Sequence, residues 1–390
     1  MNHSAQHQQG SRFWKTAQRT ALAAVLLTAL GGCAWFGSSK APKPLDLGPN
    51  VVNLPVRQAW KLSISPLKDS NVRASVQGDN VVIASADGQV VSINAANGRE
   101  NWRGQAGQRL QTGVGADGRL AAVVTSGNQL VVLDAGNKLW SKPLNAAAYT
   151  APLVAGGRVF VLTADRAVSA FDAENGAHLW TQRRDGEPLV LRQQGVLMPY
   201  GNDLLVGLSG RLVAMNPDNG NIEWEAPIAS PRGTNDVERL VDLVGPASRM
   251  SNAVCARAFQ ASVGCVDANA GRTAWTQTAK GAVGIASDAE YVFGTESNGI
   301  VQAWKLMDGE KGWSVDRLQH RKLTAPLVLG RSVVTADEFG LVHMLSKRDG
   351  SHLNRLTTDG TGVTVTPVVA ADTLVVVTRG GGVYGFRPDW

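Results

Sequence analysis

A glycine followed four positions later by a tryptophan recurs along the chain at intervals near 40 residues. The six copies are Gly98/Trp102, Gly136/Trp140, Gly176/Trp180, Gly220/Trp224, Gly271/Trp275 and Gly309/Trp313. Successive tryptophans are 38, 40, 44, 51 and 38 residues apart. Each copy follows a stretch of alternating apolar and polar residues and a turn. A repeat of this length and composition predicts an all-β fold, a β-propeller with one four-stranded antiparallel blade per repeat.

The third copy illustrates the predicted strand–turn–strand unit. Residues 169–172 alternate in polarity, as a half-buried strand does, and Asn175-Gly176 supplies a turn that tolerates positive φ. Trp180 then falls on the outgoing strand. We expect these tryptophans to pack between neighbouring blades, with each indole N–H seeking a partner. Ligand binding by the row of rings is the alternative, but regular spacing favours an architectural role.

Two further repeats are incomplete, and together they predict eight blades. One has Gly350 but carries Asn354 at the tryptophan position, and the other, residues 381–386, reaches the C-terminus before its last strand. Residues 56–64 resemble an outgoing strand, with Trp60 lying 42 residues before Trp102. We expect this early strand to pair with the C-terminal strand and close the ring, which also protects sheet edges. The propeller is assigned to residues 56–390.

The first 32 residues predict a removable export signal. They contain a basic segment and a ten-residue apolar run, residues 21–30, that is too short to span a bilayer. Leu30-Gly31-Gly32-Cys33 follows and resembles the lipobox of bacterial lipoproteins. The resemblance implies cleavage before Cys33, acylation of that residue and stable anchoring by its acyl chains. Ala34 at the next position implies sorting to the outer membrane. An ordinary secretory signal with a chance cysteine is the alternative.

Residues 33–55 are predicted to form a lipid-bearing, flexible tether, because four prolines lie between positions 41 and 55. The formal net charge of the whole chain is +6, and removal of the three cationic residues of the signal leaves about +3. This modest charge gives no indication of a nucleic-acid partner.

Cys255 and Cys265 flank a predicted hairpin whose tip lies near Gln260. If the hairpin is symmetric, the two cysteines face each other across antiparallel strands, within the range that a disulfide spans. An exported protein meets an oxidising compartment. We therefore predict a disulfide; two buried free thiols are the alternative.

Two segments outside the repeats are candidate binding loops. The longest interval between tryptophans contains an insertion over residues 229–249, and one repeat earlier Leu189 and Leu191 lie beside Arg192. Loops on a rigid ring commonly carry function, and arginine with large apolar residues is typical of interaction hot spots. The alternative is that both leucines are core residues of a strand.

The lipobox, the proline-rich segment and the tryptophan repeats together resemble the BamB family, β-propeller lipoproteins of the outer-membrane β-barrel assembly machinery. Two segments carry the more specific likeness. They are Leu189, Leu191 and Arg192 in the first, and Glu238, Arg239, Leu240 and Asp242 in the second. The resemblance implies that both segments contact a periplasmic POTRA domain of BamA, the barrel-forming subunit. It also implies a scaffolding role, indirect association with other subunits, and guidance of unfolded outer-membrane proteins by β-augmentation. Val244 stands where the family often has a second acid.

A quinoprotein dehydrogenase on the same ring is the enzymatic alternative. The family of those enzymes uses adjacent cysteines, a calcium site and a catalytic aspartate, whereas this chain has no adjacent cysteines and its six histidines show no metal-ligand spacing. We therefore expect no catalytic residues, no metal and no cofactor. A periplasmic ligand-binding propeller outside the assembly machinery is the third possibility, and only the two loop segments separate it from the first.

Overall fold

The computed structural model describes residues 42–67, 74–185, 189–231, 234–235 and 239–389. The signal segment and Cys33 lie outside these residues. The regular secondary structure of the described residues consists of β-strands, and none of these residues forms a helix that is long and apolar enough to cross a membrane.

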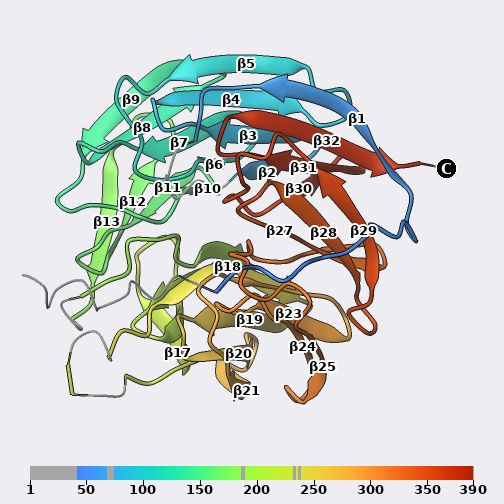
Figure 1. Ribbon diagram of the computed structural model, residues 1–390. Helices are drawn as coiled ribbons and strands as arrows, with labels where there is room; N and C mark the ends of the chain where they lie inside the picture. Colours follow the sequence, from blue (N-terminus) through green and yellow to red (C-terminus); the bar gives the residue numbers. More distant parts are fainter. Residues whose placement is uncertain (1–41, 68–73, 186–188, 232–233, 236–238, 390) are drawn as a thin grey trace, which may run out of the picture. The chain divides into compact units, whose positions relative to one another are not determined.

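Thirty-two strands in the described residues form eight four-stranded antiparallel sheets, which confirms the predicted eight-bladed propeller (Figure 1). Blade 1 consists of β2 (Ser75–Gln77), β3 (Asn80–Ala84), β4 (Gln89–Asn94) and β5 (Glu100–Gln105); blade 2 of β6 (Gly115–Ala116), β7 (Leu120–Val124), β8 (Gln129–Asp134) and β9 (Asn137–Pro143); blade 3 of β10 (Leu153–Ala155), β11 (Arg158–Leu162), β12 (Ala167–Asp172) and β13 (His178–Arg183); blade 4 of β14 (Leu197–Tyr200), β15 (Asp203–Leu208), β16 (Arg211–Met215) and β17 (Ile222–Pro227).

The second half of the ring continues in the same order. Blade 5 consists of β18 (Leu243–Met250), β19 (Ala253–Ala258), β20 (Ser262–Asp267) and β21 (Arg272–Thr278); blade 6 of β22 (Ile285–Ser287), β23 (Tyr291–Thr295), β24 (Val301–Lys305) and β25 (Lys311–Val315); blade 7 of β26 (Leu327–Leu329), β27 (Ser332–Ala336), β28 (Leu341–Ser346) and β29 (His352–Thr357); blade 8 of β30 (Val368–Ala370), β31 (Thr373–Val377), β32 (Gly382–Pro388) and β1 (Val56–Ser63).

The ring closes in blade 8, where the two ends of the propeller share one sheet. Strand β1 pairs antiparallel with β32, from Val56 opposite Pro388 to Ser63 opposite Gly382. The blue strand β1 and the red strand β32 lie side by side in Figure 1. The prediction that the early strand completes the last blade is therefore confirmed.

The hydrophobic core is divided among the junctions between blades. Between blades 8 and 1, for example, Val375 and Val383 pack with Val81 and Val91. Between blades 3 and 4, Phe160 and Trp180 pack with Leu204. Both faces of each sheet are therefore apolar, which explains the nearly continuous apolar runs of the central strands.

Each repeated tryptophan contacts the repeated glycine of the following blade. A Cβ on Gly98 would lie 2.7 Å from the ring of Trp60, and Gly176 has the same relation to Trp140. The indole N–H of Trp60 donates to the carbonyl of Ala95, at 2.9 Å. Further indoles that donate to a turn carbonyl of the next blade are Trp140, Trp180, Trp275 and Trp313. The repeat is thus a docking device between blades, with glycine required for space and for its positive φ.

Blade 7 departs from this pattern because the outer strand of blade 8 comes from the other end of the chain. In the part of the chain that the structure describes, β32 and β1 are not joined by the glycine turn that the ring contacts in the other blades. Asn354 takes the tryptophan position, and its side-chain amide donates to the Leu54 carbonyl at 2.8 Å. The substitution that made this repeat look degenerate therefore fits the closure of the ring.

Residues 44–55 do not form the predicted flexible tether. Leu47 is only 7% exposed and packs in the cluster between blades 6 and 7. The backbone N–H of Asn53 donates to the Leu353 carbonyl at 2.7 Å, and Arg355 donates to the Gly48 carbonyl at 2.9 Å. We call residues 44–55 the strap. The four prolines predicted a free linker, but apolar side chains and hydrogen bonds hold the strap against the outer edge of blade 7.

The cysteine hairpin has the register that its spacing predicts. Cys255 in β19 lies opposite Cys265 in β20, and Gln260 adopts a φ of 48° at the tip. A disulfide joins the two side chains within blade 5. Both cysteines are buried.

Candidate functional site

Each blade-to-blade connection emerges at the same end of the strands as the turn between the second and third strands of a blade. This follows from the antiparallel order, because the chain reverses direction at each strand. We call this end of the propeller the connection face. The two candidate segments lie on it, before β14 and before β18.

Residues 189–195 form a connection without regular strand pairing. Leu189 is 39% exposed and Leu191 is half-buried. The alternative that both leucines are core residues of a strand is therefore wrong. The connection instead presents Leu189 and Arg192 at the surface.

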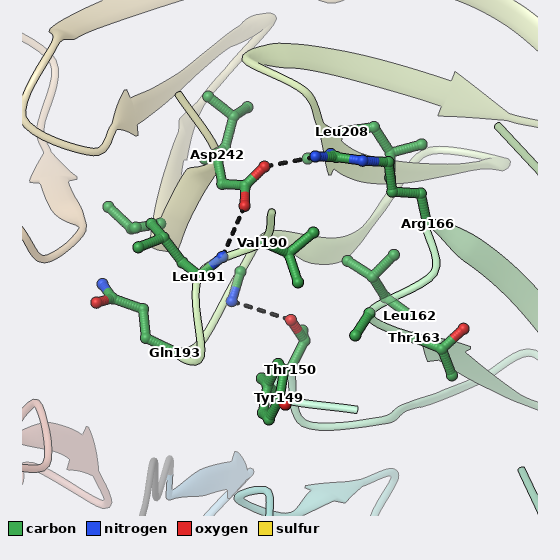
Figure 2. Close-up of a pocket in the computed structure, with 15 residues that line it drawn as sticks. Tyr149, Thr150, Leu162, Thr163, Arg166, Val190, Leu191, Gln193, Leu208 and Asp242 are labelled. Carbon is green, nitrogen blue, oxygen red and sulfur yellow. Dashed lines mark hydrogen bonds and ion pairs between the residues drawn. The ribbon is translucent and has the colours of Figure 1, made fainter. Parts of the chain in front are cut away.

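Asp242 joins the two candidate segments. One of its carboxylate oxygens accepts a hydrogen bond from the backbone N–H of Leu191, at 2.9 Å. The other faces the guanidinium of Arg166, at 3.3 Å. Figure 2 shows the carboxylate between these two groups. Asp242 thus lies inside the site, where its side chain is 18% exposed.

Arg166 connects four parts of the connection face. It lies in the turn between β11 and β12, and its side chain is 7% exposed. Besides Asp242, the guanidinium donates to the Ser209 hydroxyl at 2.8 Å and to the Leu189 carbonyl at 3.1 Å. A buried guanidinium is stable only where its charge and donors are matched, and a carboxylate with two further acceptors provides that match.

Further hydrogen bonds fix the rest of residues 189–195. The N–H of Gly195 donates to the Thr150 hydroxyl at 3.0 Å, and the side chain of Gln194 accepts from the N–H of Ala151 at 3.0 Å. The side chain of Gln193 reaches the Ala282 carbonyl in the connection between blades 5 and 6. The loop is therefore tied to neighbours on both sides.

Arg192 and the two residues before it have different surroundings. The guanidinium of Arg192 lies over the ring of Tyr149, 5.5 Å from its centroid, in a cation–π arrangement. Val190 and Leu191 instead line a small pocket with Leu162, Thr163 and Leu208 (Figure 2). The loop thus offers an oriented arginine and an exposed leucine beside a small pocket.

The second segment is described only in part. Glu238 lies outside the described residues, Arg239 is exposed and Leu240 is half-buried. Val244, the position of the missing second acid, is buried in β18. The structure therefore brings Leu191 and Asp242 into contact and places Leu189, Arg192 and Arg239 at the surface.

Sequence reasoning missed Arg166, although a signal for it exists. The corresponding turn position in four other blades is a glycine with positive φ, at Gly88, Gly299, Gly340 and Gly381. Arg166 adopts a φ of 59° at that position. A large residue where the repeat otherwise favours glycine indicates a specific role for its side chain.

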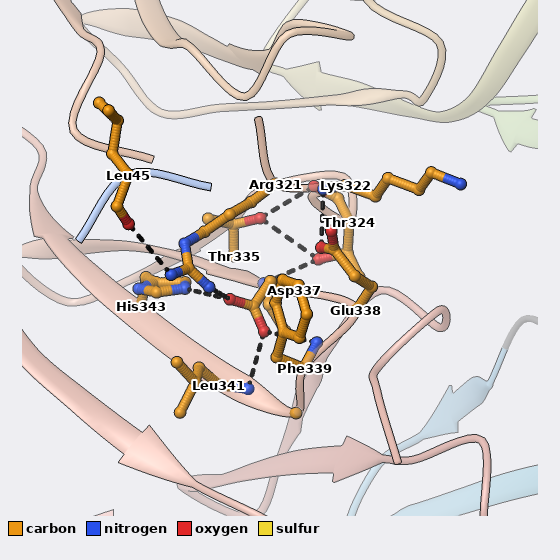
Figure 3. Close-up of polar contacts among 12 residues, drawn as sticks. Leu45, Arg321, Lys322, Thr324, Thr335, Asp337, Glu338, Phe339, Leu341 and His343 are labelled. Carbon is orange, nitrogen blue, oxygen red and sulfur yellow. Dashed lines mark hydrogen bonds and ion pairs between the residues drawn. The ribbon is translucent and has the colours of Figure 1, made fainter. Parts of the chain in front are cut away.

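Two other buried arginines on the connection face pair with carboxylates. Arg257 is bonded to Glu296, with 2.9 Å between nitrogen and oxygen. Arg321 contacts Asp337 at 2.8 Å, and Asp337 also contacts His343 at 3.0 Å (Figure 3). Arg321 also reaches the Leu45 carbonyl of the strap, at 3.3 Å. These pairs connect adjacent blades or the strap.

The pKa values of the Asp337–His343 pair follow from their burial and mutual contact. Burial lowers the pKa of His343 and outweighs the opposing effect of Asp337. Burial alone would raise the pKa of Asp337, but hydrogen bonds from His343 and from the backbone N–H groups of Leu341 and Phe339 lower it below its usual value. The pair is therefore a neutral imidazole bonded to a carboxylate. Among the described residues, no group of three or more His, Cys, Asp or Glu side chains is arranged to hold a metal ion.

We call residues 189–195 and 239–242, which Asp242 joins, the paired loops. The fold and the paired loops define a β-propeller of the quinoprotein-like repeat class with a candidate protein-binding face. The sequence matches the family described as outer membrane protein assembly factor BamB, over residues 51–111 and 86–315. It is 36% identical to the BamB of Burkholderia pseudomallei, over 95% of this chain and 98% of the relative. It is 33% identical to the BamB of Bordetella pertussis, over 96% and 98%. The chain belongs to the BamB family of outer membrane protein assembly factors.

Solved structures show the same fold. The BamB structure from Moraxella catarrhalis matches with a TM-score of 0.78 at 23% sequence identity, covering 85% of this chain and 99% of that chain. A quinohemoprotein alcohol dehydrogenase from Comamonas testosteroni matches with a TM-score of 0.64 at 13% identity, covering 86% and 78%. At these identities the likeness concerns the fold alone.

Proposed function

We propose that this protein is a non-catalytic scaffold subunit of the outer-membrane β-barrel assembly machinery and binds the periplasmic POTRA region of BamA. The hydrogen bond from the Leu191 N–H to Asp242 carries the proposal. It holds together the two loops that resemblance to the family assigns to the interface. In this role the protein positions the periplasmic arm of BamA and assists the folding and insertion of outer-membrane proteins. Other subunits associate with it indirectly, through BamA.

The chemistry of the loop supports recognition of a protein surface. Leu189 supplies an exposed apolar side chain, and Arg192 supplies a planar cation held over Tyr149. Arginines and large apolar side chains dominate the free energy of many interfaces. Because Val244 is apolar and buried, we expect the contact to depend more on Leu189 and Arg192 than on a second acid.

We place the protein on the periplasmic face of the outer membrane, anchored through lipid on Cys33. The Leu30–Cys33 lipobox supports this location. The strap lies against blades 6 and 7, whereas the paired loops lie between blades 3 and 5. The strap and the paired loops therefore lie on different blades of the ring.

Unfolded outer-membrane proteins are proposed to bind the outer strands of blades. Strands such as β9 and β13 have a hydrogen-bonded neighbour on one side only within their sheets. Such an edge can accept an extended segment by β-augmentation. Crosslinks from a stalled substrate to these strands test this role, and crosslinks confined to other surfaces would reject it.

A quinone-dependent enzyme or a small-ligand-binding module is the alternative. It rests on the shared propeller alone, and the relatives with the higher identity are assembly factors. Titration with pyrroloquinoline quinone and calcium, followed by tryptophan fluorescence, separates the two functions. Saturable quenching would favour the alternative.

The main experiment measures binding of purified BamA POTRA domains to the propeller. We expect Arg192→Glu to weaken binding at least tenfold. We expect the double variant that also carries Leu189→Ser to bind more weakly still. Arg348→Glu is the matched control, because Arg348 is exposed in the turn between β28 and β29. Failure of the wild-type protein to bind would reject the proposed partner, whereas equal binding by Arg192→Glu would move the interface elsewhere.

A further inference from the structure

We infer that Arg166 is a positioning residue for the partner-binding loop, and that Asp242 acts from within the site through Arg166 and Leu191 instead of contacting the partner. This inference deepens the proposed function and rests on it for the identity of the partner. Its structural part, that the Arg166–Asp242 ion pair helps to hold the conformation of residues 189–195, stands independently.

The Arg166 guanidinium is bonded to three other segments of the connection face. Three hydrogen bonds connect its guanidinium to Asp242, Ser209 and the Leu189 carbonyl, and all three acceptors lie in segments other than its own turn. Leu189 is the first described residue of the loop and is itself exposed, three positions before Arg192. The guanidinium therefore fixes the backbone at the beginning of the loop.

The carboxylate of Asp242 is engaged within the site. Its two carboxylate oxygens are used by different groups, one by the Arg166 guanidinium and one by the Leu191 N–H. Its backbone carbonyl accepts from the N–H of Phe259 at 3.0 Å. A carboxylate so engaged would lose these bonds if it turned outward to a partner, and the buried Arg166 guanidinium would lose its ion pair with Asp242.

The backbone at Arg166 supports a specific role for its side chain. A φ of 59° is unfavourable for a residue with a long side chain, and glycine occupies this turn position in several other blades. The strained conformation directs the guanidinium under the loop. Together, Arg166 and Asp242 preorganise Leu189 and Arg192 before the partner arrives, which reduces the conformational entropy lost on binding.

The test separates positioning from general stability. Arg166→Met removes the ion-pair partner of Asp242, and Asp242→Leu removes the carboxylate that faces Arg166, so each single variant is expected to lower the midpoint of thermal unfolding. The double variant removes both charges and is expected to recover much of that midpoint. If the pair positions the loop, amide hydrogen exchange of residues 189–195 stays at least tenfold faster than in the wild type, and POTRA affinity stays at least tenfold weaker.

Two further variants complete the test. Arg166→Lys keeps the charge but lacks the planar fork, so we expect partial recovery of loop protection. Arg321→Met is the matched control, because it also breaks a pair with a buried carboxylate but lies at the junction of blades 6 and 7. It is expected to lower the unfolding midpoint without changing exchange at residues 189–195.

Each outcome decides the inference. Wild-type exchange in the loop of the double variant would overturn it, and so would an Asp242→Asn variant that loses affinity while its loop stays protected, since that result makes Asp242 a direct contact. If the wild-type protein does not bind POTRA domains, the proposed partner fails, yet the exchange data still decide whether Arg166 positions the loop.

Discussion

Asn354 and Leu54 are 300 positions apart in the sequence, yet a 2.8 Å hydrogen bond from the Asn354 side chain to the Leu54 carbonyl joins them. Asn354 takes the place of the docking tryptophan at the one junction where the chain ends interrupt the repeat. At this position the Asn354 side chain forms hydrogen bonds with the strap, where a tryptophan ring would contact a glycine in the other blades. The N-terminal segment is thereby part of the folded propeller.

This relationship predicts that Leu47 holds the strap in place. Leu47 is buried between blades 6 and 7, and burial of a leucine contributes roughly 1.5–3 kcal/mol. We expect Leu47→Asp to release residues 44–54 locally. The measurement is hydrogen exchange at the Asn53 and Leu54 N–H groups, which donate to Leu353 and should exchange at least tenfold faster. Val51→Asp is the control, because Val51 is 58% exposed. Unchanged protection in Leu47→Asp would show that hydrogen bonds alone hold the strap.

Gly98 tests the docking of tryptophan on glycine. An alanine Cβ at this position would lie 2.7 Å from the Trp60 ring, and the φ of 72° is itself unfavourable for alanine. We expect Gly98→Ala to lower the free energy of unfolding by about 2–3 kcal/mol, from left-handed strain and displacement of the ring. Chemical denaturation measures the loss.

The matched control for that prediction is Gly78→Ala. Gly78 also has a positive φ, of 57°, but a Cβ there has nothing within 4 Å. It should therefore cost only the strain, about 1–2 kcal/mol. If the two variants lose equal stability, the glycine serves backbone conformation alone and the contact with the ring contributes nothing.

The blade number, the ring closure and the cysteine register could all be predicted from sequence because each depends on a local, repeated pattern. Strand alternation, a glycine turn and one tryptophan recur within a period, and the incomplete copies lie at the two ends. The cysteine pairing follows from symmetry about Gln260 in a single hairpin. Where the stabilising contacts depend on a pattern within one repeat unit, the spacing of residues alone is enough to predict the structure.

The strap and the Arg166 cluster could not be predicted in the same way. Leu47 finds its pocket in blades 6 and 7, more than 240 positions along the chain, and its sequence context resembles a linker. Asp242 resembles an exposed interface acid in sequence, and only three-dimensional contacts with Arg166 and Leu191 reveal its inward orientation. The repeat marks Arg166 as a departure from glycine at its turn position, but it gives no indication of the distant residues that Arg166 contacts.

The Cys255–Cys265 disulfide is predicted to stabilise blade 5 without taking part in partner binding. It closes a loop with a sequence separation of 10 residues, for which the chain-entropy relation gives about 2–3 kcal/mol. We expect Cys255→Ala with Cys265→Ala to lower the free energy of unfolding by that amount. POTRA affinity should stay within twofold of the wild-type value. A tenfold loss of affinity would instead indicate that blade 5 transmits its distortion to residues 239–242.

The Asp337–His343 pair predicts a loss of stability on mild acidification. Burial lowers the pKa of His343 in the folded protein, so below the unfolded value near 6.5 the unfolded chain binds more protons. Stability then falls as the pH drops from about 7 toward the folded pKa. The lowered pKa of Asp337 acts in a separate window. Its contribution is fully present above the unfolded value of about 3.9 and is lost as the pH falls through the folded pKa.

Denaturant unfolding of wild-type protein and His343→Gln at pH 7, 6 and 5 separates these contributions. Glutamine can still donate to Asp337 but does not titrate. We therefore expect the variant to be less stable at pH 7 and to lose less stability between pH 7 and 5. Part of the slope should persist, because burial also lowers the pKa of His352. Parallel curves for the two proteins would show that His343 takes no proton on unfolding in this range and would place the acid sensitivity elsewhere.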